Sequence, residues 1–214
     1  MTVPVLYSYW RSSCSWRVRI ALNLKEIDFE VKPVHLVQDG GHQHSQWYRE
    51  LNPLRQVPTL IWTDGTRLTQ SLAIMQFLDQ IKPPTSLLPD DPIHSAKVLQ
   101  YSEMINSGIQ PLQNLAVLQF LNQIDSTKLM SKKWGRTAIE NGLQAIEHDF
   151  EDSTPFLSGD KPGLADCCLI PQLYNARRFN CDLSKFSSLL KVEERCSGFE
   201  AFHKSHPDQQ VDAG

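Results

Sequence analysis

The chain has 214 residues, of which 41% are hydrophobic and 21% charged, with a formal net charge of −3 and a pI near 6.1. This composition is typical of a globular protein, and its scattered lysines and arginines provide no basic field for nucleic acid. No apolar run approaches the roughly 20 residues of a membrane span, and the first residues lack a signal-peptide pattern. We therefore expect a cytoplasmic protein with no nucleic-acid or membrane partner.

The first 83 residues alternate between the periods of strands and helices, which is typical of a mixed α/β unit. The pattern predicts strands over 3–9 and 28–36 with a helix over 16–24 between them. A Gly-rich loop at 38–43 and a poorly periodic segment, loop or helix, come next. Strands over 57–63 and 67–70 flank Asp64-Gly65, a dipeptide typical of two-residue hairpin turns. Ser71 is a good N-cap for a helix that continues to residue 81.

Four of the chain's 13 prolines lie between Lys82 and Pro92, where we place the domain boundary. The predicted domains are an α/β domain over 1–83, a linker over 84–92 and an all-helical domain over 93–214. Two apolar helix faces support the last of these; they consist of Val98, Tyr101, Ile105, Ile109 and Leu112, and of Ile139, Leu143, Ile146 and Phe150. Gly108 and Pro111 fall within the first helix and predict a kink.

The five cysteines predict free thiols rather than a disulfide framework, because their number is odd and no pair has CxxC spacing. Cys167 and Cys168 lie in the apolar run LADCCLIP, where we expect them to pack as small hydrophobic residues. His42 and His44 form only a weak metal motif without a third ligand. We assign no metal.

Three polar segments predict a binding site. The run SSCS, Ser12 to Ser15, lies where the first strand leads into a helix, and a helix N-terminus stabilises anions. A serine that merely caps the helix is the alternative explanation. Val57 precedes Pro58, and a cis bond there would leave the Val57 backbone free to pair with an extended ligand. Gln70-Ser71 adds a second helix N-terminus, suited to a carboxylate. Together these segments suit a small peptide with an anion at each end.

At this point the sequence resembles the soluble glutathione transferases. The segments SSCSWRVRIAL, DGGHQ, NPLRQVPTL, QSLAI, LLP, GIQPLQNL and NARRF, which extend over nearly the whole chain, are similar to the zeta class of that family. The resemblance implies an α/β thioredoxin-like N-terminal domain plus an all-α C-terminal domain, glutathione as cofactor and a homodimer. In one place the chain departs from the family pattern: Gly163 stands three residues before Asp166, where the family has Ser or Thr.

The resemblance also implies the site residues. Ser12, Ser13 and Cys14 would surround the glutathione sulfur, with Ser12 favoured as hydroxyl donor to the thiolate. Arg178 would bind a substrate carboxylate, although Arg11, Arg17 and Arg177 remain candidates. The other implied cofactor-binding residues are Ser15, Trp16, Arg17, Gln43, Val57, Gln70, Ser71, Gln110 and Asn114.

The implied reaction is the glutathione-dependent cis–trans isomerisation of the dicarboxylate maleylacetoacetate to fumarylacetoacetate, a step of tyrosine and phenylalanine catabolism. Transferase activity toward small α-halo acids is implied as well. Two alternatives remain open. Cys14 near a helix N-terminus would suit a glutathione thiol transferase or dehydroascorbate reductase. A non-catalytic interaction module on the same fold is the other.

Overall fold

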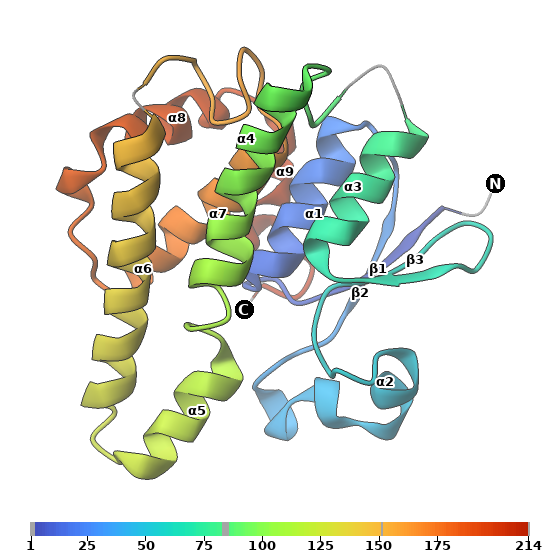
Figure 1. The fold of residues 1–214 in the computed structure, drawn as a ribbon. Coiled ribbons are helices and arrows are strands. Elements are labelled where there is room, and N and C mark those ends of the chain that lie inside the picture. The colour runs from blue at the N-terminus through green and yellow to red at the C-terminus, as the bar shows by residue number, and fades with distance from the viewer. Residues whose placement is uncertain (1–2, 83–85, 151, 214) are drawn as a thin grey trace. The chain divides into compact units, whose positions relative to one another are not determined.

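The structure is a computed structural model that describes residues 3–82, 86–150 and 152–213. The chain forms two compact units, one of Met1–Leu87 with Phe199–Gly214 and one of Leu88–Gly198. Residues 199–214 therefore group with the α/β unit, whereas the sequence predicts them as part of the helical domain. The reason is tertiary: α9 (Glu200–Ser205) packs against α1 (Ser13–Leu24), as the red and blue helices in Figure 1 show. Of the predicted linker over 84–92, residues 84 and 85 lie outside the described residues.

The first unit contains the predicted βαβ–ββα order. Its strands are β1 (Val5–Ser8), β2 (Glu30–Pro33), β3 (Thr59–Ile61) and β4 (Arg67–Thr69), and its further helices are α2 (Gln46–Leu51) and α3 (Ser71–Ile81). The sheet has the order β2-β1-β3-β4, with β1 parallel to β2 and the other neighbours antiparallel. The mixed sheet confirms the α/β prediction.

The two faces of this sheet are covered differently. Leu6 and Ser8 of β1 are buried on the face where α1 and α3 lie side by side. Tyr7 points to the opposite face and contacts the rings of Trp47 and Tyr48 from α2. The alternation of β1 therefore places helices on both faces.

Two local predictions in this unit were wrong. The first helix begins at Ser13 rather than at residue 16, because Ser12 caps it. The hairpin turn has three residues rather than two, since Trp62 N–H donates to Thr66 O and Gly65 N–H to Trp62 O. Gly65 has φ +87, the left-handed residue that such a three-residue turn requires.

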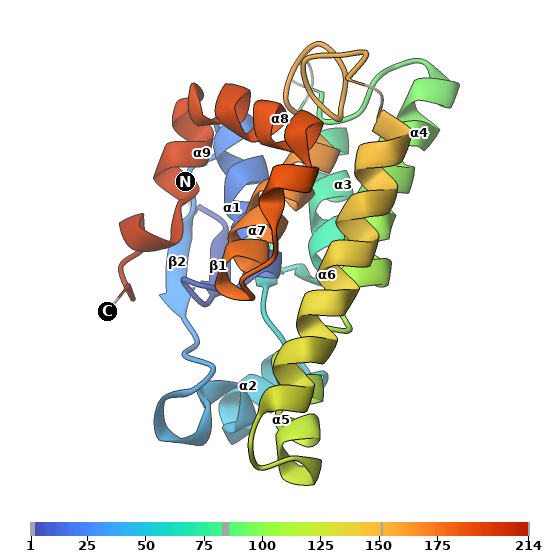
Figure 2. The same cartoon turned by 90° about the vertical axis from the view of Figure 1, so that its left-hand side faces the viewer.

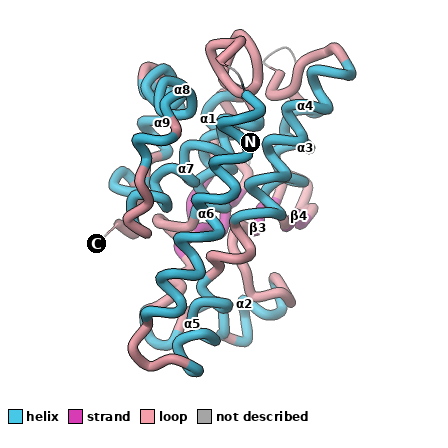
Figure 3. The backbone as a smooth tube through the Cα atoms, turned by 60° about the vertical axis from the view of Figure 1, so that its left-hand side comes forward, coloured by secondary structure: helices cyan, strands magenta, loops and turns pink. Residues whose placement is uncertain are grey.

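The second unit is helical, as predicted. It contains α4 (Pro92–Glu103), a π-helical turn (Met104–Ile109), α5 (Leu115–Ile124), α6 (Leu129–Phe150), α7 (Leu164–Arg178) and α8 (Ser187–Ser197). Figure 3 shows α6 and α7 as cyan helices, while the magenta strands belong to the first unit. α4, α6 and α8 pack around α7, most of whose side chains are buried.

The predicted kink takes the form of a π turn followed by a break. Gln110 N–H donates to Ile105 O at 2.9 Å, one residue further back than in an α-helix. Pro111 lies after this helix rather than inside it, and Leu112 is 39% exposed, which corrects its placement on the buried face. The other residues of both predicted apolar faces are buried.

The five cysteines are free, and Cys167 and Cys168 are fully buried in α7 as predicted. Burial raises the pKa of the Cys167 thiol well above its ordinary value. Within the described residues no cluster of His, Cys, Asp and Glu is arranged to hold a metal ion. A search of the same residues finds no helix that is both long enough and apolar enough to cross a membrane.

Candidate functional site

The N-terminus of α1 is the first part of the site, seen where β1 leads into α1 in Figure 2. Ser12 is the N-cap, and its Oγ accepts a hydrogen bond from Ser15 N–H at 3.2 Å. Ser12 N–H in turn donates to Tyr9 O at 3.0 Å and closes the turn. Since the bond from Ser15 uses only a lone pair of Ser12 Oγ, the hydroxyl can still donate its own proton to an anion.

The neighbouring residues of the motif differ in exposure. Ser12 and Cys14 are half-buried, while Ser13 is only 8% exposed. Ser15 is fully buried, and within the described residues its Oγ has no hydrogen-bond partner. Trp16 is buried as well and packs edge-on against His206 at 5.2 Å between ring centroids. Of this motif, Ser12 and Cys14 are therefore the most accessible side chains.

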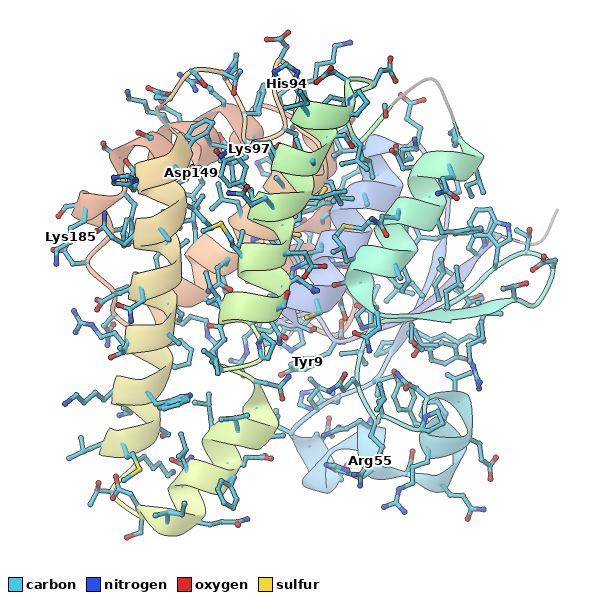
Figure 4. The ribbon with its side chains drawn as sticks, in the orientation of Figure 1. Tyr9, Arg55, His94, Lys97, Asp149 and Lys185 are labelled. Carbon is cyan, nitrogen blue, oxygen red and sulfur yellow. The ribbon has the colours of Figure 1, made fainter. Side chains whose placement is uncertain are left out.

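A small apolar cluster joins the segments of the site. Tyr9 after β1, Val34 after β2, Tyr48 of α2 and Val57 before β3 are all buried in it. The segment that leads to Ser12 is therefore fixed beside Val57. Tyr9, labelled in Figure 4, also contacts the His35 ring at 4.9 Å.

Two buried polar side chains hold the backbone just before Val57. Tyr48 Oη donates to Gln56 O at 2.7 Å, and Asn52 Nδ2 donates to the same oxygen at 2.8 Å. Burial raises the pKa of Tyr48 to about 12, so its hydroxyl remains a donor. The Val57–Pro58 peptide bond is cis. Among the described residues, the N–H and C=O of Val57 make no backbone hydrogen bond, as expected of a group that pairs with a ligand.

Gln43 is held by the Gly-rich loop. Its Nε2 donates to Leu36 O at 3.1 Å, while its buried Oε1 has no partner within the described part of the chain. A Cβ on Gly41 would lie 2.5 Å from the Gln43 amide, and Gly41 has φ +96. The glycine is therefore required for the close packing of this amide. Gln43 offers a buried acceptor that a ligand N–H would satisfy.

The N-terminus of α3 is the second helix start. Gln70, its exposed N-cap, has φ +70, a conformation that non-glycine residues rarely adopt and that concentrates at ligand-binding sites. Gln70 makes no side-chain capping bond. Ser71 is 4% exposed, and its Oγ accepts from the fully buried Arg17 Nη1 at 3.3 Å. This bond joins α1 to the start of α3.

In the second unit, Gln110 and Asn114 flank the break after the π turn. Asn114 is the N-cap of α5, since its Oδ1 accepts from Ala116 N–H at 3.0 Å. The buried Gln113 donates to Gln172 Oε1 of α7 at 2.7 Å and so ties this segment to α7. Sequence reasoning missed Gln113 and Gln172, although an amide directly after the apolar run LADCCLIP was a usable signal.

Arg177 and Arg178 form the C-terminal turn of α7. Arg177 makes a bidentate ion pair with Glu193 at 2.6 and 2.5 Å, which raises the Arg177 pKa. Arg178 is exposed, and its Nη1 contacts Asn175 Oδ1 at 3.3 Å. Glu193 therefore engages both terminal nitrogens of Arg177, and the assignment of Arg178 to a ligand carboxylate stays a prediction.

The residues of the first unit fit a glutathione-like peptide. Two helix N-termini suit anions, Gln43 Oε1 is a buried acceptor without a partner in the described residues, and the Val57 backbone is available for pairing. That Ser12, Gln43, Val57 and Ser71 hold one ligand together stays a prediction.

Comparisons with known proteins identify the family of the chain. Residues 11–81 match the family described as "Glutathione S-transferase, N-terminal domain", and residues 101–195 match its C-terminal domain. "Probable maleylacetoacetate isomerase 2" of Drosophila melanogaster is 47% identical over 98% of this chain and 90% of its own.

Solved structures are similar over the full length. The maleylacetoacetate isomerase of Anaeromyxobacter dehalogenans 2CP-1 with bound GSH has a TM-score of 0.90 and 42% identity, and covers 99% of this chain and 98% of its own. A second structure of that protein holds dicarboxyethyl glutathione and citrate in the active site. A maleyl pyruvate isomerase, described as a bacterial zeta-class glutathione S-transferase, has a TM-score of 0.92 and 33% identity, over 98% of this chain and 100% of its own.

Proposed function

The chain belongs to the zeta class of the glutathione S-transferase family, and we propose that it isomerises maleylacetoacetate to fumarylacetoacetate with glutathione as cofactor. The observation that carries this function is the full-length similarity to maleylacetoacetate isomerases. The serine motif at the start of α1 and the Val57 backbone, which makes no backbone hydrogen bond among the described residues, support it. The soluble enzyme would act on a small dicarboxylate.

When bound, glutathione supplies the thiolate whose reversible addition turns the alkene double bond into a rotatable single bond. The Ser12 hydroxyl and the N-terminus of α1 would stabilise the negative sulfur, while Gln43, Val57 and Ser71 would hold the peptide. A thiol of pKa about 8.5 is only a few per cent ionised at neutral pH, so full ionisation raises its thiolate fraction about 30-fold. The residues of the site must therefore accelerate the reaction by more than the ionisation of the glutathione thiol.

Substrate orientation would supply the part of the rate acceleration that thiol ionisation does not provide. Arg178 would bind a carboxylate of the dicarboxylate substrate and so hold the alkene for attack. A cation near the reacting atoms would also stabilise the negative charge that develops on the conjugated carbonyl. Gln110 and Asn114 would contribute polar contacts from the same unit. The same thiolate chemistry would displace halide from small α-halo acids.

A pair of assays tests this function. We expect the purified protein to isomerise maleylacetone only when glutathione is present, and to reduce hydroxyethyl disulfide slowly. Rapid disulfide reduction without isomerisation would favour the Cys14-dependent thiol transferase. Absence of both activities, with glutathione still bound, would favour the interaction module.

We also propose that the protein is a homodimer in the cytoplasm. The family resemblance supports the dimer, and the five free cysteines suit a reducing compartment. Light scattering tests the dimer, because a species at the 24.4 kDa mass of one chain would contradict it. Microscopy of the tagged protein tests the compartment.

A further inference from the structure

Arg19 of α1 is a buried cation that the function above does not use. Its side chain is 1% exposed. Nη2 donates to Trp10 O at 2.8 Å, and Nη1 donates to Ser8 Oγ at 2.9 Å and to Tyr9 O at 3.4 Å. A guanidinium therefore holds the backbone carbonyls of Tyr9 and Trp10 and the side chain of Ser8, three consecutive residues that precede the serine motif.

The C-terminal segment completes this network from the other side. Arg19 Nε donates to Ser205 O at 3.2 Å, at the end of α9. Asp212 Oδ2 accepts from Trp10 N–H at 3.0 Å. Burial lowers the pKa of Arg19 to about 9, and the Asp212 carboxylate opposes this shift. Arg19 is therefore charged at neutral pH and is balanced by a residue of the C-terminal segment.

One backbone carbonyl connects the network to Ser12, the proposed hydrogen-bond donor to the glutathione thiolate. Tyr9 O accepts from Arg19 Nη1 and also from Ser12 N–H at 3.0 Å. Trp10, whose N–H and C=O bind Asp212 and Arg19, occupies the turn between them. A shift of this backbone would move Ser12 directly, while Ser71 and Gln43 lie on other segments.

We propose that Arg19 is a positioning residue for Ser12, and that the C-terminal segment acts with it through Asp212. This inference rests on the proposed function, since it assumes that Ser12 stabilises a bound glutathione thiolate. Both residues act through the backbone of residues 9 and 10 rather than by contact with the ligand.

The test uses the full chain with glutathione alone. We would measure the pKa of the bound thiol from its ultraviolet thiolate absorbance, and the glutathione Kd by calorimetry, in Arg19→Lys, Asp212→Asn and Asp212→Ala. Asp212→Asn keeps an acceptor for Trp10 N–H and removes only the charge. Arg19→Lys keeps the charge but loses the fork that reaches several acceptors. Lys204→Gln is the control, because it breaks an exposed ion pair with Glu200 on α9.

We expect Asp212→Ala and Arg19→Lys to raise the bound thiol pKa by about one unit, which lowers the thiolate-to-thiol ratio about tenfold below both pKa values. Asp212→Asn should show a smaller rise and Lys204→Gln none. The Kd should change less than about threefold, because the contacts of Ser71 and Gln43 are preserved. Isomerisation should recover at high pH, where the thiol ionises in every variant.

A folded Asp212→Ala or Arg19→Lys protein with an unchanged thiol pKa would overturn the proposal, as would an activity loss of equal size at every pH. Both results would indicate a purely structural role. Because the titration needs only bound glutathione, it decides the role of Arg19 even if the wild-type protein binds glutathione and fails to isomerise maleylacetone.

Discussion

One helix N-terminus in each unit, that of α1 and that of α7, has the same partial positive charge but serves a different purpose. At the start of α1, Ser12 caps the helix and remains half-buried, so its hydroxyl is accessible to an anion from outside the chain. At the start of α7, the chain supplies the anion itself: Asp166 is fully buried and accepts from the N–H groups of Leu157, Ser158 and Gly163. The chain itself satisfies the N-terminus of α7, whereas the N-terminus of α1 is left accessible and can bind a ligand.

The largest expected effect tests the filled N-terminus. Burial raises the pKa of Asp166 from 3.8 to about 6, against the opposing effect of its hydrogen bonds. The folded protein therefore keeps a proton between these values that the unfolded chain has released. The stabilising contribution is complete below about pH 3.8 and is lost as the pH rises through about 6, a change of up to about 3 kcal/mol. Urea unfolding of wild type and Asp166→Asn across this range should show the difference between them decline as the pH rises.

Asp149 of α6 provides a control of opposite sign. Its pair with Lys97 of α4 at 2.6 Å, visible in Figure 4, lowers the Asp149 pKa. The stability that this carboxylate contributes is present above the unfolded pKa and is lost as the pH falls. The difference between wild type and Asp149→Asn should therefore grow with pH. If the Asp166→Asn series has the same sign as this control, hydrogen bonding at α7 outweighs burial.

Arg178 lies at the C-terminal end of α7. Its substitution tests whether this helix binds substrate in addition to packing in the core of the second unit. Arg178→Ala should lower kcat/KM for maleylacetone about 10- to 150-fold, because one charge-assisted hydrogen bond contributes about 1.5–3 kcal/mol. The glutathione Kd should be unchanged. Arg177→Ala is the matched control, since its guanidinium is paired with Glu193. If the Arg177→Ala protein fails instead, we have assigned the substrate carboxylate to the wrong arginine.

Ser12 tests the accessible N-terminus directly. Ser12→Gly removes the hydroxyl but preserves capping to within a few tenths of a kcal/mol. The rate at neutral pH should fall about 30-fold as the bound thiol loses its ionisation. Cys14→Ala should retain a substantial part of the activity. Activity that follows Cys14 rather than Ser12 would support the thiol transferase alternative.

The start of α3 is the second helix N-terminus proposed to bind glutathione. Ser71→Ala should weaken glutathione binding about tenfold, because a hydrogen bond to a charged group is lost. The variant also leaves Arg17 Nη1 without this acceptor, so some stability should be lost with it. Ser71→Thr keeps a hydroxyl and is the control. Calorimetry that gives equal affinities for the two variants would remove Ser71 from the site.

The sequence predicts these helices better than it predicts their surroundings. Helical and strand periods are local, and they correctly indicate the α/β unit and the buried faces of α4 and α6. Residues 199–214 were misplaced because their packing against α1 depends on partners such as Arg19, about 180 residues away along the chain. Leu112 was misplaced because a π turn changes the helical phase before it.

The candidate site also contains residues that the sequence predicts and residues that it does not. Ser12, Gln70 and Ser71 are recognisable because a helix start combined with hydroxyls or amides has a chemical meaning in the sequence itself. Arg19 and Gln113 are buried polar residues, and only their partners reveal what they do. A charged residue between Val18 and Ile20 was the available signal for Arg19, since lone charges are rarely buried without hydrogen-bond partners.

The smallest effect concerns the cap of α7, where Gly163 replaces the hydroxyl residue of the family pattern. Ser158 Oγ accepts from Ala165 N–H at 3.1 Å, the bond that an N-cap side chain normally makes. Ser158→Ala should therefore cost about 1 kcal/mol of unfolding free energy, as the loss of a cap does. Gly163 has φ −147, which is outside the left-handed region that favours glycine, so Gly163→Ser should be nearly neutral alone. In the double variant the new hydroxyl should recover most of the loss, because it can accept the same N–H. Additive effects in this double-mutant cycle would show that Ser158 contributes by packing rather than by capping, and that the chain has no substitute for the missing cap.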